Sequence, residues 1–258
     1  MRGSVSSPRL DGDPVRAILF DYGDTLVTHH RPVEALQRAY EEIAERLAAA
    51  LHLAVPSAAD LLIAVHDRVD GAVAAHQQSG ALEEIDIVEE HRAAYRDLGL
   101  HPADELVEQL MGVEQQAWWR GATVGDDVVA TLTVLRRAGL RVGLISNAAY
   151  LSPSMHGQLA HLGLARLLDS ATFSGEVGWR KPSPAIFERA LRDLGAGPQS
   201  TIMVGDSVAT DIAGARAAGL RTVRLREHVD DPASGPAADA VIDRLLDLPG
   251  LLGVAPPP

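Results

Sequence analysis

Short apolar runs that alternate with helix-like segments fill the second half of this chain, and this alternation constrains its fold more than any other feature. The expected strands are residues 141–145, 171–174, 201–204, 222–225 and 240–242. The expected helices are residues 128–138, 154–162, 183–194 and 209–218. A continuous apolar run is typical of a strand buried on both faces, and strands that alternate with helices form βαβ units. We therefore predict an α/β fold built on a parallel sheet.

A helical block interrupts this pattern. An apolar run at 17–20 predicts the first strand, but apolar residues then recur at steps of three and four from about 32 to 121, which indicates amphipathic helices. These helices are expected at about 33–51, 61–73, 87–98 and 106–118. We predict an α/β core domain of residues 15–30 and 122–258, an inserted all-helical domain of residues 31–121, a flexible tail at 1–14, a polar loop at 230–237 and a frayed end at 256–258.

Composition narrows the classes of function. The formal net charge is −12 and there is no cysteine. An acidic surface is unsuited to nucleic acid or to anionic membranes, and the lack of cysteine excludes disulfides, thiolate nucleophiles and cysteine metal sites. No apolar run approaches the roughly 20 residues that cross a bilayer, and the first 14 residues lack the apolar centre of a secretory signal. We expect a cytoplasmic protein without a nucleic-acid or membrane partner.

Polar residues stand where three predicted strands end, namely Asp21, Ser146 and Asp206. Ligand sites of open α/β sheets lie beyond the carboxyl ends of the strands, although Asp and Ser there also simply begin turns. Together with Lys181 these residues suit phosphoryl transfer, which needs a nucleophile, hydrogen-bond donors, a cation and a divalent metal. Asp21 and Asp206 could bind Mg²⁺, which prefers oxygen ligands. Ser146 could donate to a phosphate oxygen, and Lys181 could neutralise charge.

At these residues the chain resembles the haloacid dehalogenase superfamily. Four segments carry the resemblance in the order of the family's motifs, at residues 18–26, 144–147, 178–187 and 204–215. The resemblance runs from Ala17 to about Leu246, and the helical block stands where phosphatase-like members carry a helical, C1-type cap. It implies a Rossmann-like parallel sheet in three α/β/α layers with an inserted all-helical cap domain.

The resemblance also implies roles for individual residues. Catalytic roles would fall to Asp21 as nucleophile, Asp24, Ser146 and Lys181. Phosphate would be bound by Thr25, which also braces its loop, Ser146, Asn147 and Lys181. Mg²⁺ would be held by Asp21, the backbone carbonyl of Gly23 and Asp206, with Asp211 in support.

One position departs from the family pattern. Most phosphatases of the superfamily carry a second Asp, the general acid and base, two residues after the nucleophile, whereas this chain has Gly23 there and Asp24 one step later. Asp24 could stabilise the turn, or it or a cap residue could replace the proton shuttle. General acid–base catalysis typically raises the reaction rate by about 10²–10⁴-fold. We therefore expect a slow enzyme or one that favours good leaving groups.

We therefore predict a Mg²⁺-dependent phosphatase that acts on a small phosphorylated metabolite through an aspartyl-phosphate on Asp21. The alternatives are a metal-independent 2-haloacid dehalogenase, disfavoured by Asp206, and a catalytically impaired homologue that only binds phosphate. A phosphonate hydrolase is disfavoured because no lysine precedes Arg180 to form a Schiff base. The substrate and the oligomeric state are left open, as are the roles of four aromatic side chains, His29, His30, Trp118 and Trp119.

Overall fold

A computed structural model describes residues 14–226 and 235–254. The predicted tail up to residue 13, most of the predicted 230–237 loop and the predicted frayed end at 256–258 lie outside the described residues.

The core of the molecule is a six-stranded parallel sheet with the strand order β5-β4-β1-β6-β7-β8. Its strands are β1 (Ala17–Phe20), β4 (Arg141–Ser146), β5 (Ser170–Phe173), β6 (Thr201–Gly205), β7 (Arg221–Leu225) and β8 (Ala240–Ile242). All six coincide with the predicted strands to within two residues. The α/β parallel-sheet prediction is confirmed.

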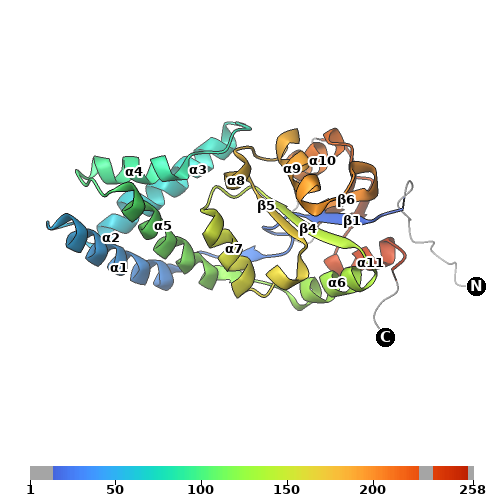
Figure 1. The fold of residues 1–258 in the computed structure, drawn as a ribbon, viewed down its shortest axis with the longest axis horizontal. Helices are drawn as coiled ribbons and strands as arrows, with labels where there is room; N and C mark the ends of the chain where they lie inside the picture. Colours follow the sequence, from blue (N-terminus) through green and yellow to red (C-terminus); the bar gives the residue numbers. More distant parts are fainter. Residues whose placement is uncertain (1–13, 227–234, 255–258) are drawn as a thin grey trace, which may run out of the picture.

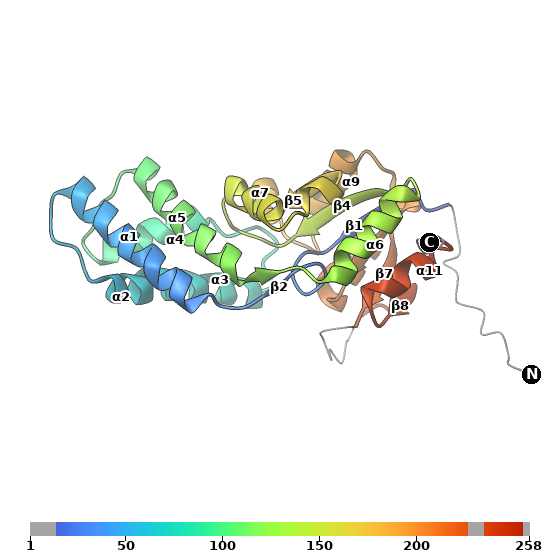
Figure 2. The ribbon, with the colours of Figure 1, turned by 90° about the horizontal axis from the view of Figure 1, so that it is seen from below.

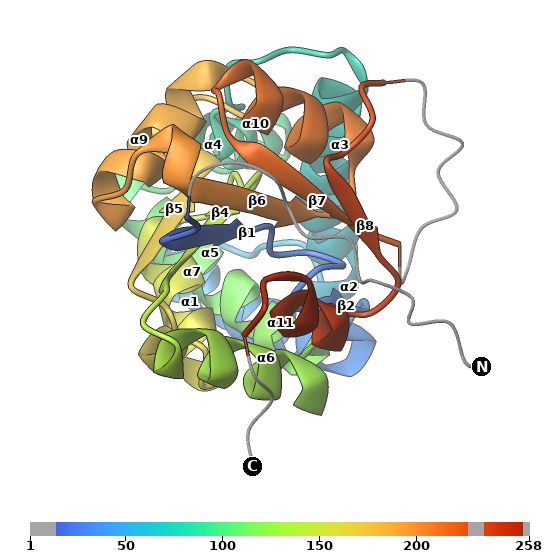
Figure 3. The ribbon, with the colours of Figure 1, turned by 90° about the vertical axis from the view of Figure 1, so that its right-hand side faces the viewer.

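Helices cover both faces of this sheet, which gives the three predicted layers (Figure 3). One face is covered by α9 (Pro184–Leu194) and α10 (Ala213–Ala217), and the other by α6 (Asp126–Arg137), α7 (Ser152–His161) and α11 (Leu248–Leu251). The central strand β1 serves both faces, because Ile18 and Phe20 pack in one apolar cluster while Ala17 and Leu19 pack in another. Complete burial explains why β1 is apolar throughout.

A helical insert separates β1 from β4 and extends from one end of the sheet (Figures 1 and 2). It consists of α1 (Val33–Leu51), α2 (Ala58–Leu61), η1 (Leu62–Asp67), α3 (Arg68–Gln78), α4 (Ile87–Asp97), α5 (Asp104–Trp118) and η2 (Trp119–Gly121). The predicted apolar steps form its own core, in which Tyr40, Ile43 and Leu47 of α1 meet Val107 and Leu110 of α5. The predicted insertion of helices after the first strand is confirmed.

A two-stranded antiparallel ribbon lies where the chain enters and leaves the insert. It pairs β2 (Thr28–His29) with β3 (Ala122–Thr123), and His30 N–H donates to the Gly121 carbonyl at 2.9 Å. Strands of two residues are too short to show a period of two, so the sequence contained no signal for them. The ribbon lies at the boundaries proposed for the core and insert domains.

The other short elements connect the layers. They are η3 (Ala165–Leu167), α8 (Ser174–Val177), η4 (Pro198–Ser200), η5 (Val208–Ile212) and η6 (Leu245–Asp247). The helix predicted at 209–218 is thus a π-helical turn, η5, followed by α10. Within the described residues, none of the helices is both long and apolar enough to span a bilayer.

Candidate active site

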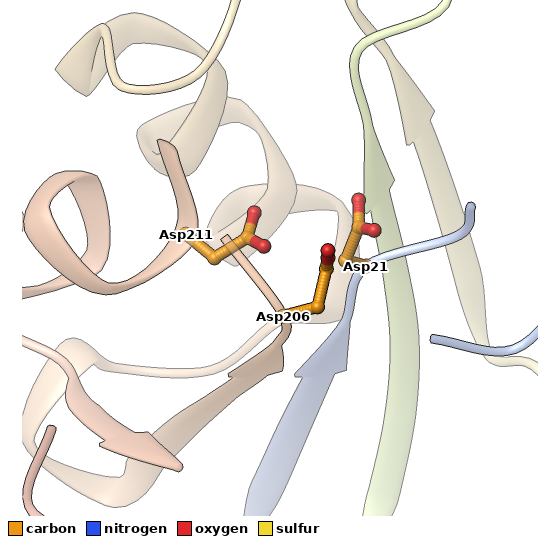
Figure 4. A group of neighbouring side chains, drawn as sticks. All are labelled: Asp21, Asp206 and Asp211. Atoms are coloured by element: carbon orange, nitrogen blue, oxygen red, sulfur yellow. The ribbon is translucent and has the colours of Figure 1, made fainter. Parts of the chain in front are cut away.

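Three carboxylates converge at the carboxyl edge of the sheet (Figure 4). Asp21 directly follows β1, Asp206 follows the neighbouring strand β6, and Asp211 comes from η5. One carboxylate oxygen of each lies within 4.8 Å of the others. Asp21 and Asp211 are buried, whereas Asp206 is partly exposed. Parallel strands explain the convergence, because their carboxyl ends share one edge of the sheet.

Lys181 lies against this acidic cluster. Its Nζ donates to Asp21 Oδ1, to Asp211 Oδ1 at 2.7 Å and to the Ile145 carbonyl at 3.3 Å. Burial by itself lowers the pKa of Lys181, but the carboxylates of Asp21 and Asp211 outweigh it and raise the pKa above its usual range. Lys181 is the only lysine of the chain and is held in the charged form.

The side-chain amide of Asn147, the residue that follows β4, positions Lys181. Lys181 N–H donates to Asn147 Oδ1 at 2.7 Å, and Asn147 Nδ2 donates back to the Lys181 carbonyl at 3.1 Å. Asn147 thus uses both ends of its amide on the backbone of Lys181. Its predicted contact with phosphate stays a prediction, and its observed contact is with the residue that carries the ammonium group.

The cluster carries more negative charge than Lys181 neutralises. Burial raises the pKa of Asp21 from 3.8 to about 7, and the Asp211 carboxylate adds to this rise while Lys181 opposes it. Burial, followed by the charge of Asp211, also raises the pKa of Asp206. Asp211 is already engaged, because its Oδ1 accepts from Lys181 and its Oδ2 from Ser207 N–H at 3.1 Å. Asp21 and Asp206 thus fit the all-oxygen donor set that Mg²⁺ prefers, with Asp211 in support.

A cavity of about 360 Å³ opens over these residues between the core and the insert. It brings together most of the residues singled out in the sequence, namely Asp21, Gly23, His29, Trp118, Trp119, Ser146, Asn147, Lys181, Asp206 and Asp211. Most of these residues lie at the carboxyl edge of the sheet, whereas Trp118 belongs to α5 and Trp119 to η2 of the insert. The lining therefore combines the acidic cluster with part of the insert.

Asp24 and Thr25 line a different hollow, together with Gly125 and Val128. Asp24 is exposed and adopts a left-handed backbone with φ of 56°, and its N–H donates to the Val27 carbonyl at 2.9 Å. This is the geometry of a turn-forming residue. The Oγ1 of Thr25 is buried without a hydrogen-bond partner among the described residues. The predicted catalytic role of Asp24 and phosphate contact of Thr25 stay predictions.

Of the four aromatic residues whose roles the sequence left open, three line the cavity and His30 is not among its described lining residues. Trp118 and Trp119 line the cavity, and each also packs against a histidine, His66 and His161 respectively. His29 lines the cavity, with its ring centroid 5.5 Å from that of Tyr22, whereas His30 does not appear among the described residues of the lining. The structure thus distinguishes two adjacent histidines that the sequence could not.

Several lining residues escaped the sequence analysis, namely Gln77, Gln115, Tyr150, Ser154, Met155 and Gln158. They are uncharged and come from separate elements, α3, α5 and the segment that includes α7. No motif or spacing marks them, because only the packing of the insert on the core brings them together.

A family model described as a haloacid dehalogenase-like hydrolase matches residues 15–219. The chain belongs to this family. The predicted membership is therefore confirmed, and the helical insert agrees with a C1-type cap in its position and all-helical composition. The matched segment contains Asp21, Lys181 and Asp206.

Individual relatives show similarities of different extent. The chain is 30% identical over 247 residues to a phosphoglycolate phosphatase of Rhodospirillum rubrum. The aligned segment covers 94% of this chain and 92% of that relative. It is 33% identical over 131 residues to a glyceraldehyde 3-phosphate phosphatase of Methanopyrus kandleri. That aligned segment covers 51% of this chain and 55% of the relative. For the latter and similar curated relatives, the chain spans about half of their length.

A solved structure shares the fold. The 2-haloacid dehalogenase of Pseudomonas syringae superposes with a TM-score of 0.65 at 24% identity, covering 93% of this chain and 98% of that one. At this identity the likeness concerns the fold alone. The chemistry must therefore be argued from the residues of the cavity.

Proposed function

We propose that this family member is a Mg²⁺-dependent phosphatase that acts on a small phosphorylated metabolite. The observation that carries the proposal is the position of Asp206, whose carboxylate approaches those of Asp21 and Asp211 to within 4.8 Å. A second carboxylate beside the nucleophile suits a metal that binds a phosphate dianion. Displacement of a halide from carbon by Asp21 needs no such metal site. The phosphatase names of several relatives agree with this choice.

Mg²⁺ would be held by the carboxylates of Asp21 and Asp206 with the carbonyl of Gly23. When bound, it would offset the repulsion between these carboxylates and a phosphate dianion. Lys181, the lining cation next to Asp21, would balance negative charge on the transferred group, and the Ser146 hydroxyl would donate to a phosphate oxygen. Asp211 would keep the Lys181 ammonium in place, and Thr25 would brace the loop after the nucleophile.

The reaction would proceed in two displacements. A carboxylate oxygen of Asp21 would attack phosphorus as the bond to the ester oxygen breaks, and the departing oxygen would take up a proton. Water would then attack the aspartyl-phosphate and return free phosphate and the carboxylate, after losing a proton. The net reaction is ester plus water to alcohol plus phosphate.

Both steps need a group that donates or accepts a proton, and Gly23 cannot supply one. Asp24 is the candidate predicted from the sequence, but it lines the neighbouring hollow. His29 lines the catalytic cavity itself, and desolvation by the surrounding protein lowers its pKa while the charge of Asp24 opposes this. We propose His29 as the second candidate for the proton shuttle.

The test is phosphate release from para-nitrophenyl phosphate and a panel of phosphorylated metabolites. Wild type and Asp21→Asn would be compared with Mg²⁺ and with a chelator, and Asp97→Asn on α4 would serve as an exposed carboxylate control. We expect Mg²⁺-dependent release by wild type and control, and a loss of at least about 10³-fold in Asp21→Asn.

Three results would contradict the proposal. Release that is unchanged in Asp21→Asn would remove the nucleophile from the mechanism. Absence of phosphate release together with chloride release from 2-chloropropionate in the presence of chelator would instead assign a dehalogenase. If neither reaction occurs although phosphate or vanadate with Mg²⁺ raises the melting temperature, the protein is a phosphate-binding homologue.

A further inference from the structure

The part of the cavity contributed mainly by the insert differs in character from the acidic cluster. We call this part the cavity roof. It is lined by Gln77, Gln115, Trp118, Trp119, Tyr150 and Met155. Two side-chain amides are combined with three aromatic rings and a thioether, and none of these groups carries a charge at neutral pH. In a phosphatase, the acidic cluster and Lys181 would face the phosphate, so the roof would face the alcohol that leaves.

Apart from Lys181, the described lining of the cavity holds no permanently charged cation for a second anionic group, and burial of His29 lowers its pKa and so favours its neutral ring. Among the described residues that line it there is no arginine, and Lys181, the only lysine of the chain, is already paired with Asp21 and Asp211. A carboxylate or second phosphate on the leaving alcohol would enter this space without a counter-ion. Burial of an unpaired anion is strongly unfavourable, and the nearby carboxylates would add repulsion.

Gln115 adds a specific polar contact to this neutral roof. Gln115 is 4% exposed, and its Oε1 accepts from the Leu151 N–H at 3.1 Å. Because the Leu151 N–H is a donor, the amide oxygen must face it and the NH₂ group must face away. That Nε2 is buried and has no hydrogen-bond partner among the described residues. Native proteins pair nearly all such groups, and because Gln115 lines the cavity, a small shift of its side chain would bring Nε2 to an acceptor on a bound ligand.

We propose that, given the phosphatase activity proposed above, the cavity selects phosphate esters whose leaving alcohol or phenol is uncharged, partly apolar and carries a hydrogen-bond acceptor for Gln115 Nε2. The aromatic rings and Met155 pack on the apolar part of the leaving group. Esters with a carboxylate or a second phosphate on the leaving group are poor substrates. Specificity thus rests on the lack of a further permanent cation among the described lining residues and on the unpaired Nε2 of Gln115.

Three aryl phosphates test the proposal, because they share one ring and differ at one position. 4-Carbamoylphenyl phosphate has an uncharged acceptor, 4-carboxyphenyl phosphate has a charge in nearly the same shape, and phenyl phosphate has neither. We expect kcat/KM with Mg²⁺ to be at least about tenfold higher for the carbamoyl ester than for the carboxyl ester. Equal values, or a preference for the carboxyl ester, would overturn the proposal.

Two substitutions separate hydrogen bonding to the substrate from support of Leu151. Gln115→Glu keeps an acceptor for the Leu151 N–H and removes the NH₂ donor, whereas Gln115→Met removes both. Gln116→Met is the control, because Gln116 is the next residue of α5 and is exposed. We expect both Gln115 variants to lower kcat/KM for the carbamoyl ester by roughly 5- to 100-fold, and to change that for phenyl phosphate less than about threefold.

The remaining outcomes are also decisive. An equal loss on all three esters, confined to Gln115→Met, would show that Gln115 acts only by holding Leu151 and would overturn its role as a donor to substrate. Absence of phosphate release from every ester and from the metabolite panel would overturn the phosphatase itself, and this inference with it. Mg²⁺-dependent phosphate release at a rate that does not vary with the charge of the leaving group would overturn this inference but leave the proposed phosphatase activity in place.

Discussion

His29 and Asp24 are the two candidates for the proton transfer that Gly23 cannot perform, and single substitutions can show which of them performs it. If His29 is the shuttle, His29→Asn should lower kcat on an alkyl phosphate by about 10²–10⁴-fold, because an alkoxide is a poor leaving group without a proton. Para-nitrophenyl phosphate, whose leaving group is good, should lose much less. The pH–rate profile of wild type should contain an ionisation below 6.5 that His29→Asn lacks, since desolvation lowers the pKa of His29 from that value.

His30→Asn is the matched control, because His30 is adjacent but not among the described lining residues. Asp24→Ala should retain turnover on the alkyl phosphate if Asp24 only forms the turn. A loss confined to Asp24→Ala would assign the shuttle to Asp24 and reject His29.

Gly205 shows how closely the backbone approaches the catalytic cluster. A Cβ at this last residue of β6 would lie 2.3 Å from Asp211 Oδ2. Gly205→Ala should therefore displace the Asp211 carboxylate from Lys181, and a misplacement of about 1 Å can cost roughly 10²-fold in rate. Phosphate release and the melting temperature would be measured together.

Gly112→Ala in α5 is the control, because a Cβ there meets no atom within 4 Å. It should leave turnover unchanged and raise stability slightly, since Ala favours a helix interior by roughly 0.5–1 kcal/mol over Gly. Full activity in Gly205→Ala would show that the Asp211–Lys181 contact is not needed for turnover.

The helices of the insert are joined by a buried polar network around Glu114 of α5. Its carboxylate accepts from the Tyr40 hydroxyl at 2.5 Å, and it lies 2.8 Å from His66 Nδ1 and 3.5 Å from His91 Nε2. His91 Nδ1 must donate to the Ile87 carbonyl at 2.7 Å. His91 Nε2 lies at ion-pair distance from Glu114 but makes no hydrogen bond with any described residue, so only the doubly protonated ring is attracted to the Glu114 carboxylate by its charge. The network therefore favours a charged His91 between α4 and α5.

This charge predicts how the stability of the insert depends on pH. Burial lowers the pKa of His91, but contacts with Glu114 outweigh it and raise the pKa above 6.5. The folded state thus binds the His91 proton more tightly than the unfolded state does. The resulting stabilisation is complete below pH 6.5 and is lost as the pH rises through the folded-state pKa. The melting temperature of wild type should fall over that range more steeply than that of His91→Gln.

His101→Gln, at an exposed histidine just before α5, is the control and should keep the slope of wild type. Equal slopes in wild type and His91→Gln would show that His91 is not protonated preferentially in the folded protein.

For the whole molecule, the acidic cluster predicts a link between Mg²⁺ and stability. At about 100 times the dissociation constant, Mg²⁺ should stabilise the folded protein by about 2.7 kcal/mol, or roughly 5–10 °C in melting temperature. Asp206→Asn should lose most of this shift, and Glu45→Gln on an exposed part of α1 should keep it.

The same shift should depend on pH. Because burial raises the folded-state pKa of Asp21 to about 7, metal-free protein loses stability as the pH rises through that value, when a buried carboxylate becomes charged. Below pH 7 protons compete with Mg²⁺ for this carboxylate. The Mg²⁺-induced rise in melting temperature should therefore be larger at pH 8 than at pH 5, and a rise independent of pH would argue against Asp21 as a ligand.

Much of the architecture was predictable from the sequence because its causes are local. Buried strands must be apolar along their length, as in β1, and an amphipathic helix must repeat its apolar residues, as in α1. Asp21, Ser146 and Asp206 could be expected at one edge because parallel strands share their direction. The four motifs then led to the family that comparison with known proteins confirms.

Other features depended on packing between residues far apart in the chain. The sequence by itself determined the six strands of the sheet, the longer helices, the position of the insert and the expectation that Asp21 and Asp206 lie at one edge of the sheet. Only the tertiary structure decided that Asn147 holds the backbone of Lys181, that His29 rather than His30 lines the cavity, and that the lining residue Gln115 has a buried donor without a partner among the described residues. These choices depend on how the insert packs on the core and on which way each side chain points, and neither periodicity nor motif spacing encodes them.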